Sequence, residues 1–320
     1  MKTTLGGRIF DTCNLALLGI FGFLAVYPFL YTFSISLSGS AEAQRQGLHL
    51  LPGNPALLAK AAEELLRLDF DAAGRAGRAY ADGLSFTAYR MVLNNREILI
   101  GYANTVFRTV VGTLLTLLAT ALGAYPLSRK EMPWRKRLAF FVLFTMLFGG
   151  GLVPSYLVVK SLHLVNSRLV YVLPGLVAAF NVLIMKSFFQ SIPESLAESA
   201  KIDGASEFAI LFRIYLPLST PILATVGLWT AVGHWNSWFD GLLYITDNSK
   251  QVLQVFLQRI VIENSTEMIE KGIVNPDVLS FTPETIKAAT VIVTILPILF
   301  LYPFVQKYFV KGIMIGGVKE

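Results

Sequence analysis

Charged residues are scarce in this 320-residue chain, at 15%, whereas hydrophobic residues make up 54%. An average soluble domain is about 25% charged, so a globule of this size would lack a polar surface. Cysteine is nearly absent as well: Cys13 is the only one in the sequence, which excludes a disulfide-stapled domain. Disorder is excluded because disordered chains are poor in apolar residues and rich in charge. The composition therefore predicts a membrane protein.

Six apolar runs are long enough to cross a bilayer, which takes about 20 apolar residues. The first run has no charge between Asp11 and Glu42. It is longer than the apolar core of about 7–15 residues in a cleavable signal peptide, so we interpret it as a span. We predict an all-α, polytopic fold with six transmembrane helices, the second preceded by an interfacial turn that starts at Ile98. The six spans are Thr12–Leu37, Thr109–Ser128, Leu138–Val159, Leu169–Met185, Leu218–Phe239 and Ala288–Gln306.

The positions of Lys and Arg predict how the chain is oriented. Residues 129–137 contain five basic residues in nine, and short loops rich in Lys and Arg stay on the cytoplasmic side. Both termini carry basic residues too, so we expect both to be cytoplasmic. Residues 240–287 have seven acidic and four basic residues, which suits the outer face. The excess of basic residues thus reflects topology, and no nucleic-acid partner is expected.

This topology divides the chain into four parts. Residues 1–37 are the N-terminal tail and first span, 98–306 the core with the other five spans, and 307–320 a cytoplasmic tail. Residues 38–97 form an outward insertion with seven basic and seven acidic residues. Leucines at helical spacing between Pro55 and Asp71 predict an amphipathic helix there. The insertion is either a solvated cap or a docking surface for an external partner.

Residues 193–217 are the most informative polar segment. Pro193 opens a short helix, Gly204 interrupts the chain, a second short helix follows, and Pro217 precedes the fifth span. Glycine adopts backbone conformations that a side chain would resist. The pattern predicts a short helix, a break and a second short helix on the cytoplasmic side. Such a unit is a rigid projection that another protein can bind.

The same segment carries a specific pattern, in which E-A-A, three residues, G, nine residues and I-x-L-P follow one another. It resembles the coupling motif of the permease subunits of ABC importers, with Ser199 in place of one alanine. Residues 98–320 look like the carbohydrate branch of these permeases, similar to the smaller, maltose-type subunit, whereas the insertion has no counterpart. The motif residues that the resemblance assigns to ATPase coupling are Glu198, Ser199, Ala200, Asp203, Gly204, Ala205, Ile214, Leu216 and Pro217.

The resemblance implies an assembly in the inner membrane of a bacterium. This chain would pair with a second permease subunit, above two ATP-binding subunits and below an extracytoplasmic solute-binding protein, and would contact membrane lipid. The sequence has no phosphate-binding loop of the G-x-x-x-x-G-K-[ST] kind. ATP and Mg are therefore expected on the partner ATPase, with no cofactor and no enzyme activity on this chain. The tail 310–319 resembles permeases that import plant or algal oligosaccharides, which predicts an oligosaccharide substrate, with an acidic one as a further hypothesis.

Polar and aromatic residues within apolar spans are the candidates for the substrate path, because polar groups in lipid are costly. Flat aromatic rings and amides also suit the apolar faces and polar edges of sugars. For Trp235 and Trp238, the competing interpretation is an aromatic belt at the outer interface of the membrane. The candidates are Asn181, Trp229, Trp235, Asn236 and Trp238.

No catalytic or metal site is predicted, because the three histidines, at positions 49, 163 and 234, lie far apart in the topology. His234 and Asp240 are either a proton relay or part of a polar rim. The competing functions are an ABC permease for peptides or metals, an ion-driven secondary transporter and a membrane-bound enzyme. A secondary transporter would have inverted repeats and acidic residues within its spans, and these spans contain no acidic residue.

Overall fold

The computed structural model describes residues 5–45, 50–67, 69–262 and 282–317, and this part of the chain is helical without a strand. His49, much of the predicted outer loop 240–287 and the last three residues of the tail lie outside it. The chain divides into two compact units. One comprises residues 1–96 with 259–296, and the other comprises residues 97–258 with 297–320.

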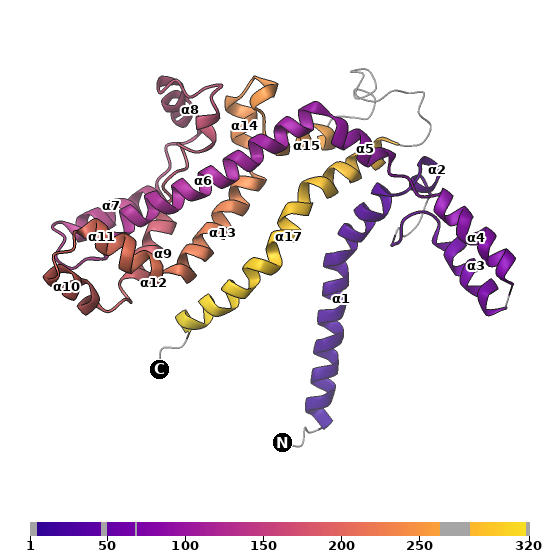
Figure 1. Cartoon of the computed structure of the whole chain (residues 1–320), viewed down its shortest axis with the longest axis horizontal. Coiled ribbons are helices and arrows are strands. Elements are labelled where there is room, and N and C mark those ends of the chain that lie inside the picture. Colours follow the sequence, from indigo (N-terminus) through magenta and orange to yellow (C-terminus); the bar gives the residue numbers. More distant parts are fainter. Residues whose placement is uncertain (1–4, 46–49, 68, 263–281, 318–320) are drawn as a thin grey trace. The chain divides into compact units, whose positions relative to one another are not determined.

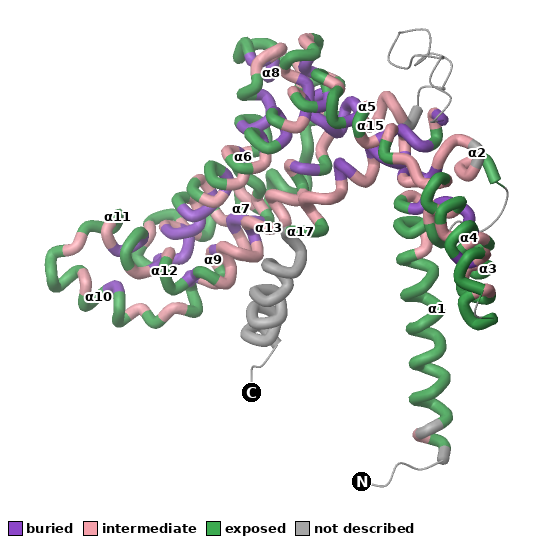
Figure 2. Tube along the Cα trace, turned by 45° about the vertical axis from the view of Figure 1, so that its right-hand side comes forward, coloured by how far each residue is buried: buried purple, intermediate pink, exposed green. Residues whose placement is uncertain are grey.

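In the first unit, α1 (Leu5–Ser36) confirms the first predicted span. Its segment Ile9–Ser36 has 28 residues, enough to cross a membrane, and its residues, most of them apolar, are exposed along nearly the whole helix (Figure 2). Such a continuous exposed apolar surface is rare on soluble proteins and marks a surface that lipid or protein covers. The helix therefore has the character of a membrane span.

The described residues of the insertion that follows α1 include four short helices. They are α2 (Ser40–Ala43), α3 (Pro55–Leu66), α4 (Phe70–Asp82) and α5 (Thr87–Asn94). The amphipathic helix is present, but it ends five residues before Asp71, and a second helix starts at Phe70. The break has a local cause, since the side chain of Asp69 accepts a hydrogen bond from Ala72 N at 2.9 Å and so caps a new helix.

The insertion returns to the point where it leaves α1. Ser38 and Leu84 form an isolated antiparallel bridge, in which Gly39 N donates to Gly83 O at 2.9 Å. The hydroxyl groups of Ser36 and Tyr89 are hydrogen-bonded at 2.7 Å. These contacts bring residues 36–39 next to residues 83–89.

The second unit is built on α6 (Arg96–Ser128), with α9 (Ala179–Phe189) and α13 (Thr220–Asn236) packed along it (Figure 1). The predicted interfacial turn at Ile98 is wrong, because the helix runs unbroken through that position. One buried cluster joins the three helices and includes Ala121, Val182 and Val226.

The third predicted span is broken. Its halves are α7 (Arg135–Leu147) and α8 (Leu152–Ser161), which meet at an angle of 114°. Three glycines, Gly149 to Gly151, separate them, and Gly151 has a φ of +84°. Consecutive glycines carry a large entropic cost in a helix and tolerate left-handed backbone, so the chain turns there.

The fourth predicted span, Leu169–Met185, is mostly not α-helical. Residues Arg168–Tyr171 form the short 3₁₀ helix η1, and Pro174 and Gly175 follow in irregular chain. The helix α9 has 11 residues, fewer than a membrane crossing needs. Proline lacks the N–H that would continue a helical hydrogen-bond ladder, which explains the late start of α9.

The fifth span corresponds to α13, which is bent by 82° from the preceding segment 207–218, and the sixth lies in α17 (Pro283–Gly317). Among the described residues, three helices are long and apolar enough to span a membrane, or up to five if each bent pair is one span. The all-helical, membrane-spanning character is thus confirmed, while the count of six and the side of the termini stay predictions. The remaining elements are α14 (Phe239–Tyr244), η3 (Asn248–Lys250) and α15 (Leu253–Ile262).

Candidate functional site

The segment 193–217 has the predicted local structure. Pro193 precedes α10 (Glu194–Ile202), and α11 (Glu207–Ile210) follows after the break. Ser206 caps α11 by accepting a hydrogen bond from Ala209 N at 3.3 Å. A π-helical turn, η2 (Leu211–Tyr215), and α12 (Leu216–Leu218) then lead to the bend before α13. We call residues 193–217 the coupling segment.

Gly204 makes the break between the two helices, with a φ of +79°. Its N–H donates to Lys201 O at 3.0 Å, while Ala205 N donates to Ala200 O at 2.9 Å, and these bonds close the end of α10. A Cβ atom at Gly204 would meet no atom within 4 Å. The need for glycine is therefore one of backbone conformation and not of space.

The coupling segment is anchored to the helical core by one face. Ala197 and Ile210 are fully buried, and Tyr215 is 2% exposed. The Tyr215 ring packs edge-on against Tyr125 of α6 and Phe189 of α9, with ring centroids 5.0 and 5.6 Å apart. Edge-to-face aromatic packing of this kind fixes orientation. The segment is therefore held against the end of α6 and α9.

The opposite face of the coupling segment is open. Ile202 is 86% exposed and Leu196 is 43% exposed, both on α10. Of the predicted coupling residues, Glu198, Ser199, Asp203, Gly204 and Pro217 are exposed, and Ala200, Ala205, Ile214 and Leu216 are half-buried. The segment thus combines a buried face with an exposed one that carries apolar side chains.

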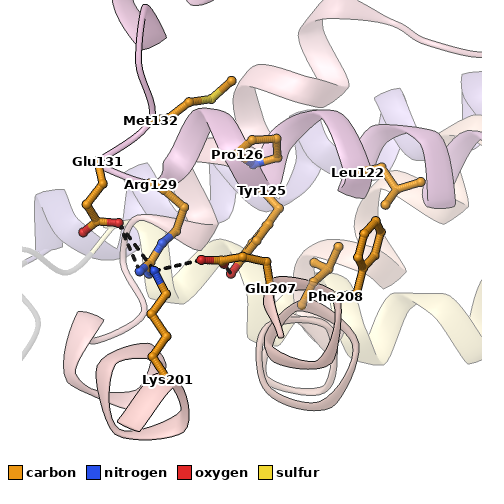
Figure 3. Close-up of a pocket in the computed structure, with 10 residues that line it drawn as sticks. Leu122, Tyr125, Pro126, Arg129, Glu131, Met132, Lys201, Glu207 and Phe208 are labelled. Carbon is orange, nitrogen blue, oxygen red and sulfur yellow. Dashed lines mark hydrogen bonds and ion pairs between the residues drawn. The ribbon is translucent and has the colours of Figure 1, made fainter. Parts of the chain in front are cut away.

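A polar network ties the coupling segment to the end of α6 (Figure 3). Tyr125 donates a hydrogen bond to Glu207 at 2.5 Å, and Lys201 Nζ lies 2.8 Å from the other Glu207 oxygen. Arg129, only 7% exposed, donates to the Tyr215 hydroxyl at 3.0 Å. None of the five residues of this network, Tyr125, Arg129, Lys201, Glu207 and Tyr215, belongs to the motif-derived prediction. Two of them, Tyr125 and Arg129, lie at the end of the second predicted span, where the basic loop 129–137 begins.

A second ion pair joins the basic loop to α10. Lys130 Nζ donates to Glu194 Oε2 at 2.8 Å. This hydrogen bond lowers the pKa of Glu194 below its usual value and raises the pKa of Lys130 above its usual value. Both groups therefore stay charged at neutral pH, and the pair is solvent-screened because Lys130 is exposed.

The structure brings together two of the predicted substrate-path residues. Trp229 Nε1 donates to Asn181 Oδ1 at 2.9 Å, which links α13 to α9. Trp235 is buried and packs edge-on against Tyr102, whereas the Asn236 amide donates to Val232 O at 3.0 Å. A role for these residues, and for Trp238, in a substrate path stays a prediction.

His234 and Asp240 contact the same buried cation. Arg108 of α6 is 4% exposed, and its Nη1 donates to Asp240 Oδ1 at 3.0 Å and to Ser237 O at 3.0 Å. Its Nε donates to His234 Nδ1 at 3.4 Å. Asp240 is therefore half of a partly buried ion pair that joins α14 to α6. The sequence suggested a proton relay or a polar rim for His234 and Asp240, and neither interpretation included Arg108.

Exposed apolar helices, a long helical core and a projecting helix–break–helix define a membrane-embedded subunit. A model of the family described as "binding-protein-dependent transport system inner membrane component" matches residues 98–315. The chain belongs to this family, as its coupling motif predicts, and it is a multi-pass protein of the inner membrane.

Named relatives cover the chain almost from end to end. Protein LplC of Bacillus subtilis is 38% identical, and the match covers 100% of this chain and 98% of LplC. The polygalacturonan/rhamnogalacturonan transport system permease protein YtcP of the same organism is also 38% identical, over 98% of this chain and 99% of YtcP. Both matches extend beyond residues 98–315, the part of the chain that the family model covers.

A solved structure gives the same fold. A chain from a bacterial ABC transporter involved in the import of the acidic polysaccharide alginate superposes with a TM-score of 0.82. It is 32% identical, and the match covers 96% of this chain and 98% of that chain. The expected likeness to ABC importer permeases is therefore confirmed.

Proposed function

We propose that this chain is a permease subunit of an ATP-driven importer and forms half of the translocation path for an oligosaccharide. Its partners are a second permease, two ATP-binding subunits and an extracytoplasmic solute-binding protein. The family supports a binding-protein-dependent transport role. The observation that carries the coupling role is the structure around Gly204. Gly204 has a φ of +79° and separates α10 from α11, and the two helices form a projection with a buried base.

The carbohydrate assignment comes from the relatives. YtcP is named for polygalacturonan and rhamnogalacturonan, and the structural relative imports alginate, which its description calls an acidic polysaccharide. Both match nearly the whole chain, including the parts outside the coupling motif. An acidic oligosaccharide is therefore our proposed substrate class.

Coupling to ATP hydrolysis is proposed to occur through the exposed face of α10. Ile202 and Leu196 would fill an apolar cleft on the ATPase, while Glu198 would stay at the rim. The buried contacts of Tyr215 would carry the motion to α6 and α9. The ATPase would then drive this chain between two conformational states by making different contacts with each. A binding partner shifts a conformational equilibrium only by the difference in its affinity for the two states.

Transport by the complete complex in proteoliposomes tests this function. Uptake should require ATP, the binding protein and this chain, and a panel of labelled ligands should show binding-protein affinity for acidic oligosaccharides. Affinity confined to peptides or metal ions would support the alternative permease class. Uptake that follows an ion gradient without ATP would support a secondary transporter.

A further inference from the structure

A hollow of about 520 Å³ lies on the loop between α6 and α7 and on the first turn of α7. Among the described residues, four basic and two apolar side chains line it and no carboxylate does. They are Lys130, Arg135, Lys136, Arg137, Met132 and Trp134. Lys130 is neutralised by Glu194 from outside the hollow, at 2.8 Å. The three basic residues 135–137 have no ion pair with any described residue. We call residues 134–137 the basic turn.

The acidic residue of this loop is engaged elsewhere. The Glu131 carboxylate lies 3.4 Å from Arg129 and 4.0 Å from Lys201, and neither of these cations lines the hollow. Helix α7 begins with no acidic residue in its first turn and no side-chain N-cap. The first turn of a helix favours anions and disfavours cations, because its free N–H groups carry partial positive charge. Three cations in that turn are therefore an arrangement that an external anion would stabilise.

Trp134 is an exposed aromatic residue at the edge of the hollow. It has a φ of +63°, which is uncommon for a bulky residue, and it is 71% exposed. The central carbon of the Arg137 guanidinium lies 5.1 Å from the centroid of its ring, within the range of a cation–π contact. Tryptophan is enriched where a membrane protein meets the membrane–water interface. The pair thus has the composition expected at the level of lipid head groups.

Exposed apolar side chains follow the basic turn directly. Phe140 and Phe141 are 67% and 64% exposed. They come four residues after Lys136 and Arg137, respectively, and residues four apart lie on one face of a helix. Each of these two cations is therefore followed, about 5.4 Å further along the helix axis, by an exposed aromatic ring. Phosphate and acyl chain follow one another in the same order in a phospholipid.

We propose that the basic turn binds an anionic phospholipid. The phosphate contacts Lys136 and Arg137, Trp134 lies at the level of the glycerol backbone, and an acyl chain runs along Phe141. The lipid holds the start of α7 at the membrane surface, so lipid composition influences how firmly the loop between α6 and α7 is fixed.

Two other anions could use the same cations. A soluble phosphate compound and an acidic surface of a protein partner would both contact the basic turn without covering the exposed rings of α7. Continuity with those rings favours lipid, because burying apolar surface stabilises a complex in proportion to the area buried.

Native mass spectrometry of the detergent-purified complete complex tests the site, with dioleoyl phosphatidylglycerol and dioleoyl phosphatidylcholine as probes. We expect tighter retention of phosphatidylglycerol, and equal retention of the two lipids would overturn the proposal. Arg137→Gln should weaken phosphatidylglycerol retention about tenfold, the loss expected for one charge-assisted hydrogen bond. This variant keeps four of the five basic residues in the loop 129–137, so the chain should keep its orientation in the membrane.

A matched control separates this site from general attraction to basic side chains. Arg213 of η2 is also an exposed arginine without an ion pair to any described residue, and it lies outside the hollow. Arg213→Gln should leave phosphatidylglycerol retention unchanged, and an effect equal to that of Arg137→Gln would overturn the proposal. Phe141→Ala should weaken phosphatidylglycerol retention although it removes no charge. Unchanged retention in Phe141→Ala would overturn the predicted path of the acyl chain.

Two further measurements separate lipid from the other anions. Glycerol 1-phosphate carries the phosphate without acyl chains, and displacement of phosphatidylglycerol by this compound at equal concentration would overturn the lipid assignment. The double variant Arg135→Gln, Arg137→Gln should leave recovery of the ATPase subunits in lipid-depleted detergent unchanged. Loss of those subunits together with wild-type phosphatidylglycerol retention would overturn the proposal in favour of a protein partner.

Discussion

Arg108 and Asp240 form an ion pair across 132 residues of sequence and join α6 to the first turn of α14. Arg108 is 4% exposed, while the Asp240 side chain is 24% exposed. The guanidinium also donates to Ser237 O and lies over the Tyr171 ring, with its central carbon 5.0 Å from the ring centroid. This buried cation organises the end of the second unit opposite the coupling segment.

Asp240→Ala should destabilise the protein strongly, by about 3–5 kcal/mol, because it leaves Arg108 as an uncompensated buried charge. The midpoint of thermal unfolding of the purified complex measures this effect. Glu63→Ala is the control, since Glu63 pairs with Arg67 on the surface of α3, and both side chains are more than half exposed. The control should leave the midpoint unchanged, and equal shifts for both variants would contradict the prediction.

Gly204→Val should uncouple the chain from its ATPase. A β-branched residue at a φ of +79° is a strong outlier, so α10 and α11 would change their relative direction. We expect normal amounts of the chain in the membrane but weak recovery of the ATPase subunits in a pull-down.

Gly204→Asn is the matched control for the backbone, because asparagine adopts left-handed conformations far more readily. It should retain most of the ATPase recovery. If Gly204→Val also recovered the ATPase at the wild-type level, the break would not be required for coupling.

Tyr215→Phe should lower stability by about 1–3 kcal/mol, the usual cost of leaving one buried partner unsatisfied. It removes the hydroxyl that accepts from Arg129 at 3.0 Å and keeps the ring contacts. Tyr125→Phe is the comparison, because its partner Glu207 is 53% exposed and keeps Lys201. A thermal melt in which Tyr125→Phe had the larger effect would contradict this ranking.

Removal of residues 39–83 should leave membrane insertion intact and impair capture of the loaded binding protein. Ser38 and Leu84 are already paired, so a two-residue Asn-Gly turn can join them. Membrane levels and ATPase recovery serve as controls for folding. Unchanged transport at limiting binding-protein concentration would argue for a solvated cap.

The sequence alone determined the all-helical membrane class, because apolar runs of 20 or more residues have few other structures open to them. It also predicted the helix–glycine–helix order around Gly204, since capping and glycine conformation are local properties. The family assignment followed from the spacing within residues 198–217.

Tertiary structure decided where apolar runs stop being helices. The 114° bend after Leu147 and the late start of α9 at Ala179 place irregular chain within runs that hydropathy alone counts as spans. Hydropathy measures how favourably a segment partitions into lipid. It does not detect a break in a helix when neighbouring protein satisfies the polar backbone groups at the break.

Tertiary structure also decided which polar residues meet. The partners Arg108 and Asp240 are far apart in sequence, as are Tyr125 and Glu207, and no periodicity links the members of either pair. Sequence patterns predict contacts between residues within one or two turns of a helix. These contacts instead depend on how α6 packs against segments that lie more than 80 residues further along the chain. The coupling motif could therefore be predicted from the sequence. The buried network that anchors it to α6 could be identified only from the folded structure.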